Sequence, residues 1–344
     1  MLSVTVTDTR RARVVPAALA VLALLLCACG GVDVDAPSRD TIWGGPTASG
    51  VYVGAAAPED VRAFGEWRGS QPTIAVDFLA DETWEKIAQP TWWVDAWRGQ
   101  GLEVAYSVPL LPDTGGTLED GAAGDYDDHF TALAQTLVDG GQGDARLRLG
   151  WEFNGGWYAW SASETSGRPG ASPEHFAAYW RSIVDAMRAV EGADFSFVWN
   201  PNRGYEQFPA EQAWPGADYV DEIGVDVYDQ SWIRDHNDAE ARFQEILEGD
   251  HGLLWFADFA EEHDKPLVVP EWGLTIREDG HGGGDNDVFV AGMHEFFAEH
   301  DVRWEAYFEF DAPDGLHSLQ AGRFPLGAAQ YRCRFGGSDT ACPG

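Results

Sequence analysis

Short apolar runs recur along the chain, and amphipathic stretches separate many of them. Eight runs have the β-branched and aromatic composition typical of strands, and they cover residues 51–54, 73–78, 102–108, 145–152, 195–200, 219–228, 266–271 and 304–309. Helical patterns cover residues 83–100, 125–139, 172–190, 253–263 and 288–300, and the third of these helices begins with Ser172 as N-cap before Pro173. Strands that alternate with helices in this way predict an α/β fold with a single (β/α)8 (TIM) barrel domain.

An open, doubly wound sheet is the competing α/β architecture. Such a sheet usually carries a glycine-rich phosphate-binding turn after its first strand. Residues 53–58 (VGAAAP) do not form that motif. The sequence therefore favours the closed barrel.

The charge balance of the chain argues against nucleic acids and anionic membrane surfaces as partners. The 344 residues include 57 Asp and Glu against 22 Lys and Arg, which gives a net charge of −35. Nucleic-acid binding requires clustered cationic side chains, and an anionic membrane surface would repel such a chain. We therefore expect no nucleic acid among its partners, and we expect a monomer. The 16 Trp residues can stack on ligands, although packing in the interior is the simpler explanation for any single ring.

The first residues have the features of an export signal. A basic segment at residues 10–13 precedes an apolar stretch at 14–28 that is too short to span a membrane. Residues 26–29 (LCAC) resemble a bacterial lipobox, which implies a lipid on Cys29, and plain secretion is the alternative. We expect a signal peptide at residues 1–28, a tether at 29–44, the barrel domain at 45–335 and a tail at 336–344. The protein would then be extracellular and contact the membrane only through its lipid anchor.

Two further cysteines, Cys333 and Cys342, lie near the C-terminus. Export makes a disulfide between them feasible, and two free thiols are the alternative. Residues 281–287 (HGGGDND) lack the spacing and the terminal Glu of a calcium-binding loop, and no spacing suggests a zinc site. We therefore expect neither a metal nor a cofactor.

Carboxylates follow two strands on opposite walls of the predicted barrel. Glu152 ends the fourth strand and Glu271 ends the seventh. Barrel enzymes carry their chemistry at these strand ends. Retaining glycoside hydrolysis needs two carboxyl groups ~5–5.5 Å apart, one to protonate the leaving oxygen and one to attack the anomeric carbon. The pair matches that requirement, although a solvated charge or an ion pair would explain either residue alone.

Strand alternation places Arg148 inside the barrel together with Glu152, and it places Asp226 on the same face as Tyr228. A guanidinium in a barrel interior needs a carboxylate partner. We therefore predict that Arg148 pairs with Asp226 or with a catalytic Glu. An ordinary structural ion pair and a pair that takes part in catalysis both fit this placement.

Five stretches together resemble glycoside hydrolase family 26. They are residues 148–160 (RLGWEFNGGWYAW), 198–201 (VWNP), 214–221 with 224–228 (WPGADYVD and GVDVY), 265–273 (KPLVVPEWG) and 282–286 (GGGDN). The resemblance implies a (β/α)8 enzyme that acts on β-mannan, β-1,3-xylan or mixed-linkage β-glucan. It implies Glu152 as acid/base and Glu271 as nucleophile, with Tyr228 beside the nucleophile.

The candidate substrate-binding residues adjoin these strand ends. The resemblance implies that Trp157 and Trp199 line the cleft. Trp151 and Trp272 flank the two carboxylates in sequence, and their rings could contact a sugar. Asn154 and Asn200 could each bind a pair of sugar hydroxyls or could cap a turn.

Two positions depart from the mannanases of this family. Trp151 stands where His commonly precedes the acid/base, and residues 106–109 (YSVP) lack the polar residue usual at the end of the third strand. We expect a retaining endo-β-glycanase with mannan as the first choice of substrate. The alternatives are a non-catalytic glycan-binding surface lipoprotein and a glycosidase that remodels the cell's own envelope polysaccharide.

Overall fold

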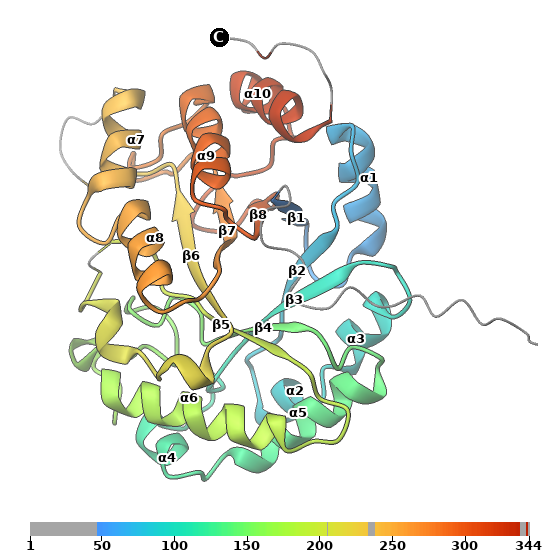
Figure 1. Ribbon diagram of the computed structural model, residues 1–344, viewed down its shortest axis with the longest axis vertical. Coiled ribbons are helices and arrows are strands. Elements are labelled where there is room, and N and C mark those ends of the chain that lie inside the picture. The colour runs from blue at the N-terminus through green and yellow to red at the C-terminus, as the bar shows by residue number, and fades with distance from the viewer. Residues whose placement is uncertain (1–46, 205, 233–237, 338–341, 343–344) are drawn as a thin grey trace, which may run out of the picture. The chain divides into compact units, whose positions relative to one another are not determined.

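A computed structural model describes residues 47–204, 206–232, 238–337 and 342. Eight parallel strands, each hydrogen-bonded to the next and the last to the first, close into a barrel. Helices lie around these strands (Figure 1). The predicted (β/α)8 architecture is confirmed. The predicted signal peptide, tether and Cys29 lie outside the described residues. Within the described part of the chain, no helix is long and apolar enough to cross a membrane.

The strands are β1 (Ala48–Tyr52), β2 (Ile74–Phe78), β3 (Glu103–Val108), β4 (Arg146–Leu149), β5 (Ser196–Trp199), β6 (Glu222–Tyr228), β7 (Leu267–Gly273) and β8 (Trp304–Phe308). The helices are α1 (Pro58–Arg68), α2 (Trp84–Ala88), α3 (Thr91–Trp97), α4 (Leu118–Ala122), α5 (Asp127–Asp139), α6 (Pro173–Arg188), α7 (Ala239–Glu248), α8 (Leu253–Glu262), α9 (Asp287–Glu299) and α10 (Pro325–Phe335).

The helix boundaries differ from the expectations for local reasons. The helix expected over residues 83–100 divides into α2 and α3 around Pro90, which cannot donate a backbone hydrogen bond. Helix α6 begins as predicted, because the Ser172 hydroxyl accepts a hydrogen bond from His175 N at 3.1 Å. Helices α1, α4, α7 and α10 were not predicted, although α1 and α10 both begin with Pro.

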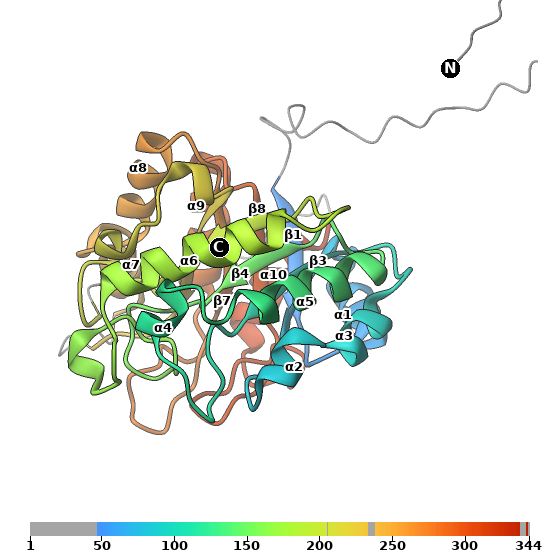
Figure 2. The same ribbon diagram turned by 90° about the horizontal axis from the view of Figure 1, so that it is seen from below.

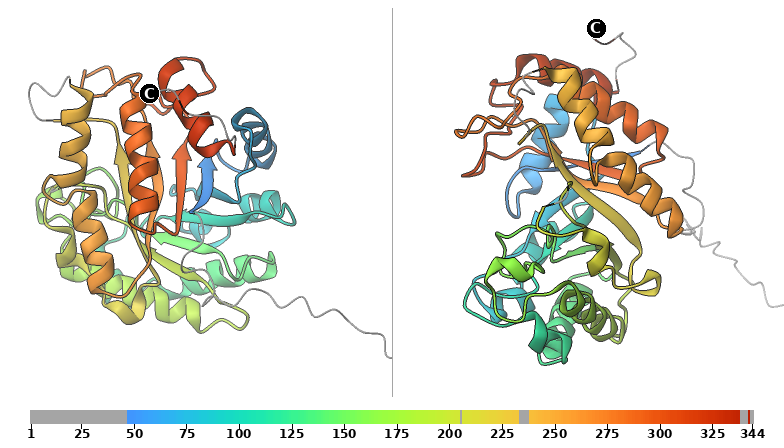
Figure 3. Two further views of the ribbon diagram at one scale, coloured as in Figure 1. Left: turned by 45° about the horizontal axis from the view of Figure 1, so that its top comes forward. Right: turned by 90° about the vertical axis from the view of Figure 1, so that its left-hand side faces the viewer.

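Apolar side chains form a core on each side of the strands. The inner cluster fills the barrel with residues such as Val76, Val198 and Val268. The larger, outer cluster lies between the strands and the helices. Helices α5 and α6 run side by side on this outer layer (Figure 2), and α7, α9 and α10 form a row beside the strands β6, β7 and β8 (Figure 3). This double core holds the ends of the strands in place.

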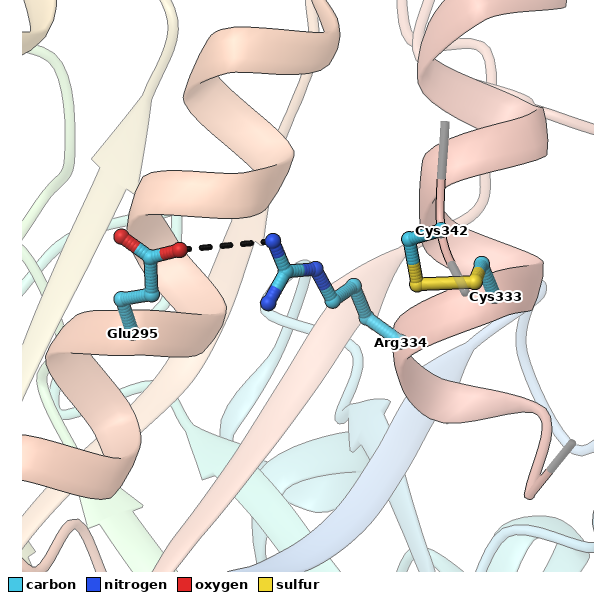
Figure 4. Close-up of a disulfide and its surroundings, with 4 residues drawn as sticks. All are labelled: Glu295, Cys333, Arg334 and Cys342. Atoms are coloured by element: carbon cyan, nitrogen blue, oxygen red, sulfur yellow. Dashed lines mark hydrogen bonds and ion pairs between the residues drawn. A yellow bond between two sulfur atoms is a disulfide. The ribbon is translucent and has the colours of Figure 1, made fainter. Parts of the chain in front are cut away.

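An ion pair and a disulfide are among the contacts that join the C-terminal helix to its surroundings. Arg334 of α10 pairs with Glu295 of α9 at 3.3 Å, and a disulfide joins Cys333 to Cys342 (Figure 4). The disulfide considered from the sequence is therefore present. It connects the segment predicted as a tail to the last helix of the barrel.

Glu305 of β8 is fully buried between the strands and the outer helices. Its Oε2 accepts a hydrogen bond from Trp272 Nε1 at 2.5 Å, and its Oε1 has no partner. Burial raises the pKa of this carboxyl to about 7, because an apolar environment penalises the charged form. The fold therefore favours the protonated form of Glu305.

This burial predicts a specific pH dependence of stability. A carboxyl whose pKa is raised by folding stabilises the protein below its unfolded pKa, and that contribution is lost as the pH rises through the folded pKa. A rise from 4.5 to about 7 corresponds to about 3 kcal/mol. Glu305→Gln should therefore raise the thermal midpoint, relative to the unchanged protein, at pH 8 but not at pH 4.5. Glu66→Gln, at an exposed position of α1, is the control, and its effect on the thermal midpoint should be the same at both pH values. An equal effect of Glu305→Gln at both pH values would contradict the prediction.

Candidate active site

A fully buried guanidinium lies where the strands β3 to β7 end. Arg148 of β4 donates from Nη1 to the Ser107 hydroxyl at 2.8 Å and from Nε to Asn200 Oδ1 at 2.9 Å. Its Nη2 donates to Asp226 Oδ2 at 2.6 Å and to Glu271 Oε2 at 3.1 Å. The prediction that Arg148 pairs with an inward-facing acid is confirmed, since Arg148 contacts both Asp226 and Glu271.

Glu271 is held from two sides. In addition to the Arg148 contact, the Tyr228 hydroxyl donates to Oε1 at 2.6 Å. Both donors fix the orientation of the carboxylate. The expected position of Tyr228 beside Glu271 is therefore confirmed.

An irregularity in β7 turns Glu271 toward the barrel axis. Gly224 pairs with Val268, but Asp226 pairs with Glu271, so β7 contains one more residue than β6 over this interval. Val268 belongs to the inner core. Regular alternation from Val268 would bring Pro270 inward and Glu271 outward. The extra residue reverses this order, as β-bulges beside active sites commonly do.

Glu152 reaches the same point by a different route. Strand β4 ends at Leu149, not at residue 152 as expected, and Gly150 and Glu152 both have left-handed backbone conformations with φ of 53° and 52°. Such a conformation costs a non-glycine residue on the order of 1–3 kcal/mol. The turn is held by hydrogen bonds from Glu152 N to Asn200 O at 2.8 Å and from Gly155 N to Glu152 O at 3.0 Å. A non-glycine residue in this conformation points to a functional constraint on its side chain.

Three carboxyl groups gather beside the buried guanidinium of Arg148, which contacts two of them. One oxygen from each of Glu152, Asp226 and Glu271 lies within 4.8 Å of the others. Burial raises the pKa of Glu152 well above its ordinary value, and the charges of Glu271 and Asp226 raise it further. Burial likewise raises the pKa of Asp226, while Arg148 opposes the shift. The cluster therefore favours a retained proton, and the half-buried Glu152 can present one to a ligand.

The two carboxylates lie at the base of a pocket of about 680 Å³. Its walls come from strand ends and loops all around the barrel, and they are formed by Tyr52, Phe78, Glu152, Trp157, Tyr158, Asn202, Glu206, Tyr228, Gln230, Trp232, Glu271, Arg277, Phe308, Phe310, Ala312, Asp314 and His317. Trp157 is 48% exposed, and its Nε1 donates to Glu152 Oε2 at 3.0 Å. A Cβ on Gly155 would overlap the Trp157 ring at 2.3 Å, so the indole lies in the space that this glycine leaves.

Only Trp157 and Tyr228 of the seven predicted substrate-binding residues line this pocket. Trp199 and Trp272 are fully buried and pack in the outer core, because both face away from the barrel axis. Trp199 follows the inward-facing Val198, and Trp272 follows the inward-facing Glu271. The expectation that these two rings contact a ligand from their places beside the strand ends is therefore wrong.

The remaining three predicted residues support the site from behind. Asn154 donates to Asn202 O and accepts from Asn202 N, both at 2.8 Å, which joins the loops after β4 and β5. Asn200 accepts from Arg148. Trp151 is buried, and its Nε1 donates to the Tyr158 hydroxyl at 2.9 Å. These side chains hold other groups of the site and do not line the pocket.

Several residues of the pocket wall were not predicted from the sequence. Tyr52 ends the first strand, and alternation toward the axis could have identified it. Tyr158 and Trp232 lie in loops, where no periodicity indicates direction. One face of Trp232 stacks on His281 at 3.9 Å between ring centroids, and the ring is 59% exposed.

Comparisons with known proteins find several similar chains. The chain is 24% identical over 179 residues to a mannan endo-1,4-β-mannosidase of Bifidobacterium adolescentis, and the match covers 48% of this chain but 17% of that protein. The chain thus spans about a sixth of the length of that relative. Among solved structures, an endo-β-1,4-mannanase from Cellulomonas fimi matches with a TM-score of 0.58 and 19% identity, over 87% of this chain and 72% of the other. The catalytic domain of a family 26 endo-β-1,4-mannanase from Bacillus sp. JAMB-750 matches with a TM-score of 0.56 and 16% identity, over 85% and 86%.

These structural similarities support the barrel fold. Residues 143–275, which contain β4 to β7 with Glu152 and Glu271, match the sequence profile described as glycosyl hydrolase family 26. Over this segment the chain therefore resembles glycosyl hydrolase family 26.

Proposed function

We propose that the protein hydrolyses a β-linked polysaccharide, with β-mannan as the first choice, by double displacement with retention of configuration. The spacing of Glu152 and Glu271 carries this proposal. Their closest carboxylate oxygens lie within 4.8 Å of each other. Inverting glycosidases separate their carboxyl groups by ~6.5–9.5 Å to leave room for a water, whereas retaining enzymes need ~5–5.5 Å. The closer spacing supports direct attack by a carboxylate.

The first step uses the two groups in different protonation states. Glu152, whose pKa is raised by burial and by the neighbouring charges, donates its proton to the glycosidic oxygen as the bond to the anomeric carbon breaks. Glu271, oriented by Tyr228 and Arg148, attacks that carbon with Oε2 or Oε1 and forms a glycosyl ester. The leaving sugar departs with the proton of Glu152.

The second step reverses these roles. Once Glu271 is an ester, its negative charge no longer raises the pKa of Glu152, so Glu152 is a carboxylate that can accept a proton. Water attacks the anomeric carbon from the face that the leaving sugar vacated, and Glu152 takes the proton of that water. The ester bond breaks, and Glu271 returns to its ionised form with the configuration of the sugar retained.

The form of the pocket supports an endo-acting enzyme on a polymer. The relatives named above are mannanases, which supports mannan as the first choice of substrate. Trp157 and Trp232 expose large parts of their rings on the pocket wall, and such rings can stack on the apolar face of a sugar. Two exposed platforms exceed what one sugar unit at the reacting carbon requires.

The nucleophile assignment predicts the outcome of one substitution. Glu271→Ala should lower turnover of an aryl β-mannoside or β-mannan by at least ~10³-fold, because no other group can form the ester. Azide should restore cleavage of an activated aryl substrate and give the α-glycosyl azide, identified by NMR. With Glu152→Ala as the matched variant, azide should instead give the β-glycosyl azide.

Two results would contradict this assignment. Unchanged turnover by Glu271→Ala would show that Glu271 is not the nucleophile. Formation of the product with inverted configuration by the unaltered protein would show that the reaction is not a double displacement. Binding of β-glycans without turnover by the unaltered protein would favour the non-catalytic glycan-binding alternative.

The hydrogen bond between Trp157 and Glu152 predicts a shift in the pH profile. The Trp157 N–H favours the charged carboxylate and lowers the pKa of Glu152 against the larger effects that raise it. Because Glu152 must be protonated to act as acid, activity declines as the pH rises through its pKa. Trp157→Phe removes the donor, so the alkaline limb of kcat/KM should move to higher pH. Trp232→Phe, which alters another ring of the pocket wall, should leave the limb in place. A shift to lower pH by Trp157→Phe would refute this account.

The exposed ring of Trp232 predicts a dependence on substrate length. Trp232→Ala should raise KM for β-mannan or long manno-oligosaccharides by roughly five- to tenfold, the effect of losing a stacking contact of about 1 kcal/mol. Hydrolysis of an aryl monoglycoside or disaccharide should change little. Trp92→Ala is the matched control, because Trp92 is also 58% exposed but lies outside the pocket. Equal losses on long and short substrates would argue against a separate contact at Trp232.

A further inference from the structure

Tyr158 combines a fixed ring with a free proton. Its ring stacks on Trp160 with centroids 4.5 Å apart and planes 10° apart, and Trp151 meets it edge-on at 4.8 Å. The Trp151 Nε1 donates to the Tyr158 oxygen at 2.9 Å, and the Trp160 Nε1 donates to the Trp151 carbonyl at 2.9 Å. The position of the phenol oxygen is thus determined from three sides.

The hydroxyl proton of Tyr158 has no acceptor among the residues that the structure describes. The Trp151 N–H can only donate, so it occupies a lone pair of the phenol oxygen and leaves the O–H for another partner. Tyr158 lines the pocket beside Glu152. A half-buried donor without an acceptor is costly, and a ligand hydroxyl in the pocket would satisfy it.

Burial and the neighbouring negative charges keep the Tyr158 hydroxyl protonated, so it remains a hydrogen-bond donor. Burial raises the pKa of Tyr158 well above its ordinary value, and the charges of Glu152 and Glu271 raise it further. Both reacting carboxylates therefore act on the phenol, which stays protonated wherever the enzyme is active. Tyr228, another tyrosine of the pocket wall, already donates its proton to Glu271 and is not available to a sugar.

We propose that Tyr158 donates a hydrogen bond to a hydroxyl of the sugar unit that Glu271 attacks, and that Trp151 is the positioning residue that aims it. This inference rests on the proposed function and adds a specificity-determining contact to it. The contact selects sugars that present a hydroxyl at this point of the wall. A site built to donate to a hydroxyl discriminates against a sugar that lacks it, because the donor is then left unpaired.

Substitutions that leave the rings in place test the contact. Tyr158→Phe keeps the stack on Trp160 and removes only the hydroxyl, and it should lower kcat/KM by roughly three- to tenfold. Trp151→Phe should give a smaller loss. The double variant should lose no more than Tyr158→Phe alone, because Trp151 acts through Tyr158. Tyr331→Phe, which removes a buried hydroxyl outside the pocket, is the control and should retain full activity.

Substrates that each lack one hydroxyl distinguish a contact with the sugar from a structural role of Tyr158. A purely structural role would lower kcat/KM by the same factor on every one of these substrates. The probes are aryl β-disaccharides of the sugar that the unaltered protein cleaves, with one hydroxyl at a time replaced by hydrogen on the unit attached to the aryl group. On one of these substrates, Tyr158→Phe and the unaltered protein should have equal kcat/KM. If the ratio stays the same on every substrate, or if Tyr158→Phe equals the unaltered protein on the complete disaccharide, the inference is overturned. If the unaltered protein cleaves no β-glycan, the proposed function itself fails.

Discussion

The contact of Arg148 with Asp226 and Glu271 is the interaction on which the rest of the site depends. A buried guanidinium is expensive to desolvate, and removing one partner of such a pair typically costs ~3–5 kcal/mol. Here the head group donates to side chains from β3 and β6, from β7 and from the residue that follows β5. Its carbon also lies 5.6 Å from the Phe78 ring of β2. The ends of most of the strands are therefore held at fixed distances by one side chain.

This arrangement also sets the protonation of the reacting groups. Three carboxyls surround one cation, so the positive charge does not neutralise all of them. Arg148 touches Asp226 and Glu271 but not Glu152, and Tyr228 adds a donor to Glu271 alone. The proton is accordingly favoured on a carboxyl that the guanidinium does not contact. Under the proposed mechanism, two glutamates of the same chemistry thus act as acid and nucleophile because their surroundings differ.

The sequence predicted those parts of the site that follow from strand order and parity. Eight strand-like runs predicted the barrel, and alternation along β4 predicted that Arg148 faces an acid. Parity failed where the backbone departs from a regular strand. The bulge in β7 brings Glu271 inward, where regular alternation from Val268 would have turned it outward. Alternation from Arg148 did place Glu152 inward, although β4 itself ends at Leu149. The family resemblance placed Trp199 in the cleft, and its position beside a strand end placed Trp272 there. Strand parity does not, because each follows an inward-facing residue and so points to the helices.

The contacts within the loops of the pocket wall could not be predicted, and there is a physical reason for this. Loops carry no periodicity, so nothing in residues 150–160 indicates that Trp157 would lie over Gly155 or that Trp151 would donate to Tyr158. Their order comes from local contacts, including the backbone bond of Glu152 to Asn200 and the two bonds between Asn154 and Asn202. These bonds offset the strain of the left-handed turn and join it to the loop after β5. Because Asn200, which follows β5, contacts both Arg148 and the backbone N–H of Glu152, both Glu152 on the loop and Glu271 on β7 are positioned relative to Arg148. Their separation can then remain constant while the pocket walls adapt to different sugars.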